Sequence, residues 1–330
     1  MKNRFSQGRR KALSRLAAAG ALWAAGGGAL ASANWPQKTL RLIVPYPAGG
    51  VSDIIARLMA QRLAVALGQS IVVDNRPGAG GTMGIDAMVK TGGDGNTFAF
   101  TPISPITLSP HLVKVGFNPM KDIAAVAPVM YSPVYVCATE AFKGKTLADA
   151  ITQAKSGSVT MACLGFGSVG HIMIEQLRRQ TASDLVPVPY KGDSQLLPDA
   201  VGAQFDILLI NPSEPVNALI QRGKLRVIAV GSPERLPAWP DAPTLGELGY
   251  ADANMTSLFG FVAPASISPE AVQRLNAEVN VLLQQPELRD RVQKLDNVAL
   301  SQTASQFGAS LRSAFEQNGK IVKQANIKAE

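Results

Sequence analysis

The sequence predicts an α/β protein with two lobes, and three observations lead to that expectation. Short runs of β-branched and other apolar residues alternate with segments whose apolar residues recur at helical spacing, which is typical of mainly parallel sheets covered by helices. The chain has 330 residues, more than the roughly 250–300 residues at which single hydrophobic cores stop growing. Two longer apolar stretches, 125–138 and 255–263, are expected to carry the chain into a second lobe and back.

The first lobe is expected to begin with a strand-loop-helix unit. Residues 40–44 predict a buried strand, and residues 45–50, which end in two glycines, predict the loop after it. A helix should start near Ser52 or Asp53, because either side chain can accept hydrogen bonds from free N–H groups of the first turn. The unit then repeats as a strand over 70–74, a loop over 75–81 and a helix over 82–91, followed by a strand over 97–101.

The second lobe is expected to contain a unit of the same kind. A run over 159–163 predicts its first strand, and a glycine-rich loop over 164–170 separates this strand from a helix that starts at His171. Further strands are expected over 185–189, 205–210 and 225–230.

The end of the chain carries two expected helices that return to the first lobe. One opens at the Ser-Pro-Glu segment 268–270, where proline suits the first helical turn, and the other spans 304–325. The two crossings imply a first lobe built from residues 34–131 and 259–330, around a second lobe of residues 132–258. Such a hinged pair faces one cleft with the loops that follow its strands.

The formal net charge of +8 is concentrated in residues 1–33. That segment has six Lys or Arg and no Asp or Glu, then an Ala/Gly/Leu-rich stretch, and it ends in Ala31-Ser32-Ala33, the small-residue pattern of a signal-peptidase site. Without it, Lys plus Arg falls from 32 to 26 against 24 acidic residues, which leaves +2. We therefore predict export to the periplasm with cleavage after about Ala33, and we expect no nucleic-acid partner.

Two export routes fit this segment. Arg9-Arg10, with a weakly apolar stretch behind it, favours a twin-arginine signal. An ordinary Sec signal with a basic head is the alternative. The segment has no cysteine for lipid attachment, so we expect a protein that is free in the periplasm.

Metal, redox and cofactor chemistry have little support in the residue types. The chain has two histidines, His111 and His171, and no CxxC motif, so neither a metal site nor a cofactor is expected. Cys137 and Cys163 lie in apolar runs that predict buried thiols. An oxidising compartment leaves a disulfide between them as the alternative.

Three strand-to-helix loops, 47–52, 77–84 and 165–170, are rich in glycine and small residues. Glycine allows the backbone to approach a ligand closely and to turn several N–H groups into one concavity. A helix N-terminus behind such a loop favours an anion without any Lys or Arg. The loops therefore predict a site where the main chain holds a carboxylate or phosphate, with simple tight turns as the alternative for any one loop.

The third of these loops also matches a dinucleotide-binding fingerprint. Residues 165–170 read GxGxxG between a strand and a helix, and Asp184 lies near the spacing of an acidic ribose contact. An exported dinucleotide-binding oxidoreductase is therefore an alternative function. The unit lies in mid-chain, however, and no nucleophile is paired with a base around it, so we predict that the protein is not an enzyme.

Side chains near the loops have two interpretations each. Asp53 would serve as a general base or, more simply, as a helix cap. His171 would orient a ligand oxygen, or it would be a cap or core residue. Tyr46 and Phe166 would form apolar walls of the cleft or pack in the core.

Four segments, in order along the mature chain, resemble the Bug family, the solute-binding proteins of tripartite tricarboxylate transporters. The segments are RLIVPYPAGG at 41–50 with Asp53, DNRPGAGGT at 74–82, VPYKG at 188–192, and AWPDAPT at 238–244 with Gly249-Tyr250. The resemblance implies a type II periplasmic-binding-protein fold, in which two α/β lobes joined by crossing strands close on a small organic acid.

The resemblance also implies the ligand-binding residues, because family members bind one carboxylate between two loops, one from each lobe. The implied residues are, from the first lobe, Tyr46, Pro47, Ala48, Gly49, Asp53, Thr101 and Ser104, and, from the second, Gly167, Ser168, His171 and Asn211. Gly49 is expected to be a position where a bulky side chain abolishes binding. Ile210 stands where many members carry an acidic residue, which implies a non-amino, partly apolar or aromatic carboxylate as ligand.

We therefore predict a non-catalytic, extracytoplasmic solute-binding protein. It is expected to act as a monomer, to capture a di- or tricarboxylate or an aromatic acid, and to deliver it to the membrane permease subunits of a tripartite tricarboxylate-type transporter. A ligand sensor co-receptor that uses the same closure is the other alternative, beside the oxidoreductase.

Overall fold

The strands form two sheets within the part of the chain that the computed structural model describes, residues 35–325 and 327. The expected export segment, 1–33, lies outside these residues. The chain from Lys38 onward is a unit of its own and is described by itself. Its strands are β1 (Leu40–Val44), β2 (Ile71–Asn75), β3 (Thr97–Pro102), β4 (Ile123–Ser132), β5 (Val134–Ala138), β6 (Val159–Cys163), β7 (Leu185–Pro189), β8 (Ile207–Ile210), β9 (Arg226–Gly231), β10 (Ser257–Pro264) and β11 (Val298–Ala299).

Both sheets are mixed. The first has six strands in the order β11-β4-β10-β3-β1-β2, with β1 parallel to β2 and β3, and β10 antiparallel to β3 and β4. The second has five strands in the order β7-β6-β8-β5-β9, with β6 parallel to β7 and β8, and β5 antiparallel to β8 and β9. The predicted α/β class is confirmed, and the antiparallel pairs occur where the crossing strands join each sheet.

The α-helices of the described chain cover both sheets. They are α2 (Val51–Leu67), α3 (Thr82–Val89), α4 (Ser104–Thr107), α5 (Leu147–Ser156), α6 (Val169–Thr181), α7 (Asp193–Val201), α8 (Glu214–Gln221), α9 (Pro269–Gln284), α10 (Pro286–Gln293) and α11 (Ala304–Gln324). Short 3-10 turns complete the elements, namely η1 (Ala79–Gly81), η2 (Ser109–His111) and η3 (Ala251–Ala253). We call the first sheet with α2–α4 and α9–α11 the first lobe, and the second sheet with α5–α8 the second lobe.

Side-chain caps explain where several helices begin. Thr146 and Thr303 each form a reciprocal capping box, at α5 and α11, and Ser168 accepts the N–H of His171 at α6. The expected cap at Ser52 or Asp53 was wrong, because α2 begins one residue earlier, at Val51, with no side-chain cap. The first N–H groups of α2 are therefore left to another partner.

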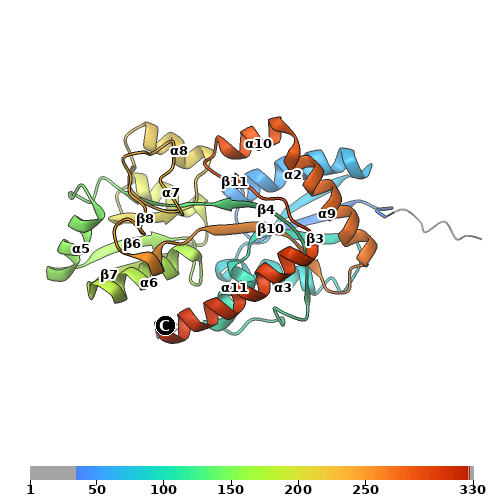
Figure 1. Ribbon diagram of the computed structural model, residues 1–330, viewed down its shortest axis with the longest axis horizontal. Helices are drawn as coiled ribbons and strands as arrows, with labels where there is room; N and C mark the ends of the chain where they lie inside the picture. The colour runs from blue at the N-terminus through green and yellow to red at the C-terminus, as the bar shows by residue number, and fades with distance from the viewer. Residues whose placement is uncertain (1–34, 326, 328–330) are drawn as a thin grey trace, which may run out of the picture. The chain divides into compact units, whose positions relative to one another are not determined.

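The expected crossings correspond to continuous strand runs between the sheets. β4 ends at Ser132 in the first sheet, and β5 begins at Val134 in the second, with only Pro133 between them. β10 returns the chain between β3 and β4. Figure 1 shows β4 and β10 between the second-lobe elements at the left and the first-lobe elements at the right. The exact lobe boundaries, 34–131 with 259–330 and 132–258, stay a prediction.

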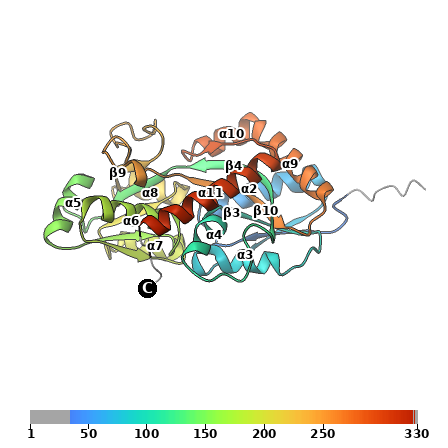
Figure 2. The ribbon, with the colours of Figure 1, turned by 60° about the horizontal axis from the view of Figure 1, so that its bottom comes forward.

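The last helix, α11, closes the core of the first lobe. Phe307 is fully buried in a cluster with apolar residues of β1, α3 and β10. Further along, Val322 packs in a cluster with Leu108 of the first lobe and Ile172 of α6. Figure 2 shows α11 lying across the front of this unit, with its C-terminal end beside α6. The helix is therefore packed against both lobes.

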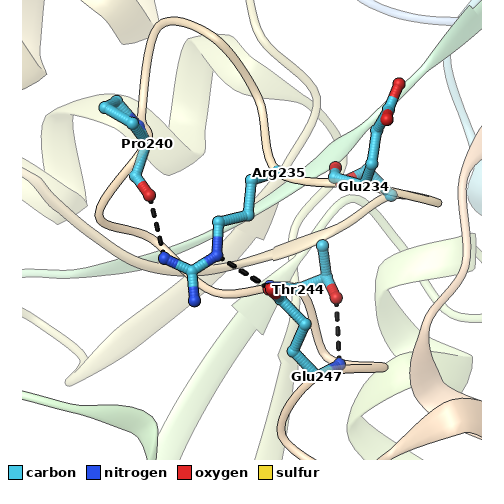
Figure 3. Close-up of polar contacts among 6 residues, drawn as sticks. Glu234, Arg235, Pro240, Thr244 and Glu247 are labelled. Atoms are coloured by element: carbon cyan, nitrogen blue, oxygen red, sulfur yellow. Dashed lines mark hydrogen bonds and ion pairs between the residues drawn. The ribbon is translucent and has the colours of Figure 1, made fainter.

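The segment between β9 and β10 is held by its own polar contacts (Figure 3). The Arg235 guanidinium donates to both carboxylate oxygens of Glu247, at 2.9 and 3.0 Å, and to the Pro240 carbonyl at 2.9 Å. Glu247 also accepts the N–H of Thr244 at 2.7 Å. These bonds explain why the 238–244 motif has a defined shape without a regular element of its own.

Cys137 and Cys163 are both free thiols and fully buried, as the preferred interpretation of the sequence predicted. Burial raises the pKa of Cys163 to about 12, so its thiol stays protonated. Among the described residues, no helix has the length and apolar character needed to cross a membrane.

Candidate ligand-binding site

A cavity of about 40 Å³ lies where the strand ends of the two lobes face each other. Its first wall comes from the loop after β1, the N-terminus of α2 and the end of β3. Its second wall comes from the N-termini of α6 and α7 and the end of β8. The space suits roughly three water molecules at about 10–15 Å³ each, so the lobes must move apart to admit an organic acid.

The N-termini of α2 in the first lobe and of α6 and α7 in the second line this cavity. Ser52 in the first turn of α2 and Val169 and Gly170 in the first turn of α6 are among the lining residues. Free N–H groups and the helix dipole make such ends favourable for an anion. No Lys, Arg or His is found among the described lining residues. Main-chain N–H groups at these helix ends are therefore the groups of this lining that favour an anion.

Hydroxyl and amide groups complete the polar lining. Tyr46 is buried, and its hydroxyl donates to the Gly80 carbonyl at 3.2 Å. Burial raises the pKa of Tyr46, so the phenol is a neutral hydrogen-bonding group. Asn211 donates to the Pro133 carbonyl at 2.8 Å and to the Ser257 hydroxyl at 3.1 Å, and thereby binds β8 to both crossing strands.

Five of the eleven predicted site residues line the cavity. They are Tyr46, Pro47, Ser104, Ser168 and Asn211. Each lies in a segment that follows a strand or at the start of a helix, where the strand ends of an α/β fold place their loops. The five residues therefore lie around one cavity, and their contact with a ligand stays a prediction.

In the first lobe, four predicted residues do not line it. Ala48 and Gly49 are exposed on the outer side of the loop. Thr101 is fully buried inside β3, and its hydroxyl donates to the Pro102 carbonyl at 2.8 Å. The Asp53 carboxylate accepts from the Gly49 N–H, the Arg57 guanidinium and the Asn75 amide, at 2.9–3.0 Å.

Asp53 is therefore a structural acceptor within the first lobe. Burial alone would raise its pKa, but the hydrogen bonds from Arg57, Asn75 and Gly49 together lower it, so the group is ionised at neutral pH. Its oxygens hold the 46–50 loop against α2 and β2. Neither the general-base interpretation nor a role in ligand contact is supported by these contacts.

In the second lobe, Gly167 and His171 do not line the cavity. A Cβ atom on Gly167 would lie 2.8 Å from the Ser109 hydroxyl oxygen, and the Gly167 carbonyl accepts from that hydroxyl at 3.4 Å. The His171 ring packs on Phe166, 4.4 Å between centroids. Burial lowers the pKa of His171 to about 4, so the ring is neutral at pH 7.

Two glycines, one in the 77–84 loop and one at the end of the 188–192 motif, allow the lobes to approach each other. A Cβ atom on Gly80 would lie 2.6 Å from the Phe166 carbonyl oxygen, and one on Gly192 would lie 2.4 Å from the Pro47 ring. Real Cβ atoms do not come so close to other heavy atoms, so only glycine permits these contacts. The absence of a side chain at Gly80 and at Gly192 therefore permits close contact between the lobes.

In the fold, Asp184 lies far from the glycine loop 165–170 of the dinucleotide fingerprint. Asp184 accepts the Val159 N–H through its carbonyl and precedes β7, at the start of the parallel β6–β7 pair. The glycine loop 165–170 follows the other end of β6. Five residues at about 3.3 Å each separate the two ends. Asp184 therefore cannot contact a ribose whose pyrophosphate lies on that loop.

Asp193 lines the cavity and was missed in the sequence. It is the first residue of α7, it is 7% exposed, and its carboxylate accepts the N–H of Val51 at the N-terminus of α2. It therefore joins the two lobes. Its position in the sequence, directly after the 188–192 motif and at a helix start, could have marked Asp193 as a site residue. Its contact with Val51, however, joins segments 142 positions apart, which no local pattern predicts.

Replacing Asp193 by asparagine should stabilise the ligand-free protein above pH 6. Burial raises the pKa of Asp193 from 3.8 to about 6, so the folded state keeps a proton that the unfolded state has released, and stability falls as pH rises through this window. At about 1.36 kcal/mol per pKa unit, the variant should gain up to about 3 kcal/mol. Thermal melts should show a higher Tm for the variant at pH 8 and no difference near pH 4. A difference independent of pH would contradict this account.

Comparisons with known proteins agree with this geometry. The model of the tripartite tricarboxylate transporter family receptor matches residues 55–327. BugT of Bordetella pertussis is 32% identical over 255 residues, which are 76% of this chain and 78% of BugT. The solved periplasmic binding protein BugD is 26% identical, with a TM-score of 0.83 over 90% of this chain and 100% of BugD.

A second solved structure holds a carboxylate. MatC of Rhodopseudomonas palustris, with bound malate, is 26% identical, with a TM-score of 0.81 over 87% of this chain and 100% of MatC. These values confirm the expected periplasmic-binding-protein fold. Because the family model matches most of the sequence, the resemblance noted in the motifs is also confirmed: the chain belongs to the tripartite tricarboxylate transporter receptor family.

Proposed function

We propose that this protein binds a small organic carboxylate in the periplasm and delivers it to the membrane permease subunits of a tripartite tricarboxylate-type transporter. The single observation that carries the proposal is the cavity between the lobes, where the N-termini of α2 and α6 meet without a basic side chain. The malate bound by MatC supports the same ligand class. Di- and tricarboxylates and aromatic acids are the candidates.

Binding follows from closure of the two lobes. Residues 34–131 with 259–330 would form one half of the site, and residues 132–258 the other. When the lobes separate, each helix N-terminus faces water. When they close on a carboxylate, the main chain replaces its hydration shell, and the low local dielectric strengthens those hydrogen bonds. The function then consists of closing the two lobes on the ligand, without a chemical reaction. This suits a monomeric binding protein and not an enzyme.

Each lobe supplies part of the proposed set of contacts. Tyr46, Pro47 and Ser104 would meet the ligand from the first lobe, with the α2 N-terminus beside them. Ser168 and Asn211 would meet it from the second lobe. Ser168 caps α6 through the His171 N–H at 3.2 Å, which fixes the first turn whose remaining N–H groups face the cavity.

A screen of the mature protein against a carboxylate panel tests this function. A ligand present at 100 times its Kd should stabilise the folded state by about 2.7 kcal/mol. At about 2–4 °C per kcal/mol for a domain of 150–250 residues, the Tm should rise by several degrees. Isothermal titration calorimetry then gives the affinity. A panel without a stabilising carboxylate, together with a shift produced by NAD or NADP, would reject the proposal in favour of the oxidoreductase.

A further inference from the structure

Asp193 gives the cavity a charge that the proposed function does not use. Among the described lining residues it is the only one with a carboxyl group, and none is Lys, Arg or His. The side chain is buried, and a Cβ atom on Gly50 would lie 2.4 Å from its Oδ2 atom. The carboxylate therefore lies in the closed site, at the contact between the two lobes.

The hydrogen-bonding capacity of this carboxylate exceeds what the protein supplies. An ionised carboxylate accepts about four hydrogen bonds, and the Val51 N–H provides one. The neighbouring Tyr46 hydroxyl already donates to Gly80. Burial outweighs the Val51 contact and raises the pKa of Asp193 to about 6, so at pH 7 a buried, ionised group needs a further donor.

The other ionisable groups around Asp193 do not provide that donor. On α2, Asp53 is committed to Arg57, Asn75 and Gly49. From the loop after β1, Tyr46 is neutral, because burial raises its pKa. On the segment that leads into α7, Lys191 is exposed and is not a lining residue. A ligand that carries a donor would therefore complete the hydrogen bonding of this carboxylate.

We propose that Asp193 selects ligands that carry a protonated amine next to their carboxylate, with the ammonium group bound by Asp193 and the carboxylate by the N-terminus of α6. The inference rests on the proposed function and names its substrate class. It reverses the expectation drawn from Ile210, because α7, which lines the same wall of the cavity as the end of β8, supplies the acid that this position lacks. An ammonium is favoured because it neutralises the one charge of the site and donates up to three hydrogen bonds.

Matched pairs of probes that differ only in the amine test this assignment. Succinate with L-aspartate, and 3-phenylpropionate with L-phenylalanine, would be titrated calorimetrically at pH 7.5. In the pair whose size fits the site, the amine-bearing member should bind at least about tenfold more tightly. Its affinity should weaken as pH falls below about 6, because protonation of Asp193 removes the partner of the ammonium.

Variants of α7 separate a direct role from a structural one. Asp193→Asn should remove the preference for the amine while the variant remains folded and stable. The control is Asp199→Asn on the same helix, whose carboxylate accepts from the Tyr190 hydroxyl at 2.8 Å and is not a lining group. This control should keep the wild-type preference and its pH dependence.

Two outcomes would overturn the inference. The amine-free member of each pair could bind more tightly, with affinity increasing on acidification, which would show that Asp193 enters the complex as a protonated donor to a second carboxylate. Asp193→Asn could also leave the preference unchanged. In both cases carboxylate binding, and hence the proposed function, stands, whereas failure of every carboxylate in the wild-type titrations would reject the function itself.

Discussion

Replacing Gly50 by alanine is expected to weaken ligand binding roughly 10- to 100-fold. The backbone of Gly50, at φ −83° and ψ 173°, suits any residue, so the substitution causes no local strain. Its Cβ atom, however, would lie 2.4 Å from the Asp193 Oδ2 atom across the interface between the lobes. Overpacking of this kind costs about 1–3 kcal/mol, and each 1.4 kcal/mol is a factor of ten in Kd. Calorimetric titration with the tightest ligand of the screen measures the loss.

Gly49→Ala is the matched control for this variant. Gly49 has φ +89°, but a Cβ atom there would have no heavy atom within 4 Å. The substitution should therefore lower the Tm through backbone strain of about 1 kcal/mol and leave affinity nearly unchanged. This expectation differs from the one drawn from the sequence, in which Gly49 was the critical position. If Gly49→Ala abolishes binding and Gly50→Ala does not, the closure geometry described here is wrong.

Replacing Phe307 by alanine is expected to destabilise the protein by about 3–5 kcal/mol. The ring is fully buried, and its Cζ atom lies 2.5 Å from where a Cβ atom of Gly260 would be, so α11 fills the space that this glycine leaves on β10. Removal of the ring leaves a cavity in the first-lobe core. Thermal or urea unfolding should show a Tm lower by roughly 6–20 °C, at about 2–4 °C per kcal/mol.

Two further variants test whether packing is the cause. Phe307→Leu retains most of the buried volume and should lose clearly less stability than Phe307→Ala. Ser313→Ala, at an exposed position of the same helix, should change the free energy of unfolding by less than about 0.5 kcal/mol. A loss of under 1 kcal/mol in Phe307→Ala would show that α11 is not needed to close this core.

Local patterns were sufficient for most of the regular elements. The strand runs at 40–44, 97–101 and 159–163 were predicted because a continuous apolar run of that length is buried on both faces of a sheet. The helix from residue 269 was predicted from its Ser-Pro-Glu start, and Ser268 does cap it. Short elements such as β11 and α10 were missed, because two residues give no periodicity and a proline at 286 separates α10 from α9.

The candidate site was predictable as a region but only partly as a set of residues. Loops that follow strands must lie at one edge of each sheet, so Tyr46, Ser104 and Ser168 were expected at one place, and all three line the same cavity. The side-chain directions within those loops were not. Ala48 and Gly49 follow Pro47 directly and yet face solvent, because the loop turns outward where Asp53 accepts the Gly49 N–H.

The sequence by itself determined the α/β class, the crossing strands, the glycine-rich loops and the family, because each depends on residue types at fixed spacing along the chain. Only the tertiary structure decided which glycines serve closure and which acid enters the cavity. Gly50 and Asp193 are 143 positions apart, and their contact depends on how two lobes meet. A sequence pattern shows which polar and charged side chains the chain contains. Packing between distant segments decides which of them are buried together, and buried groups must satisfy each other's charge and hydrogen bonds.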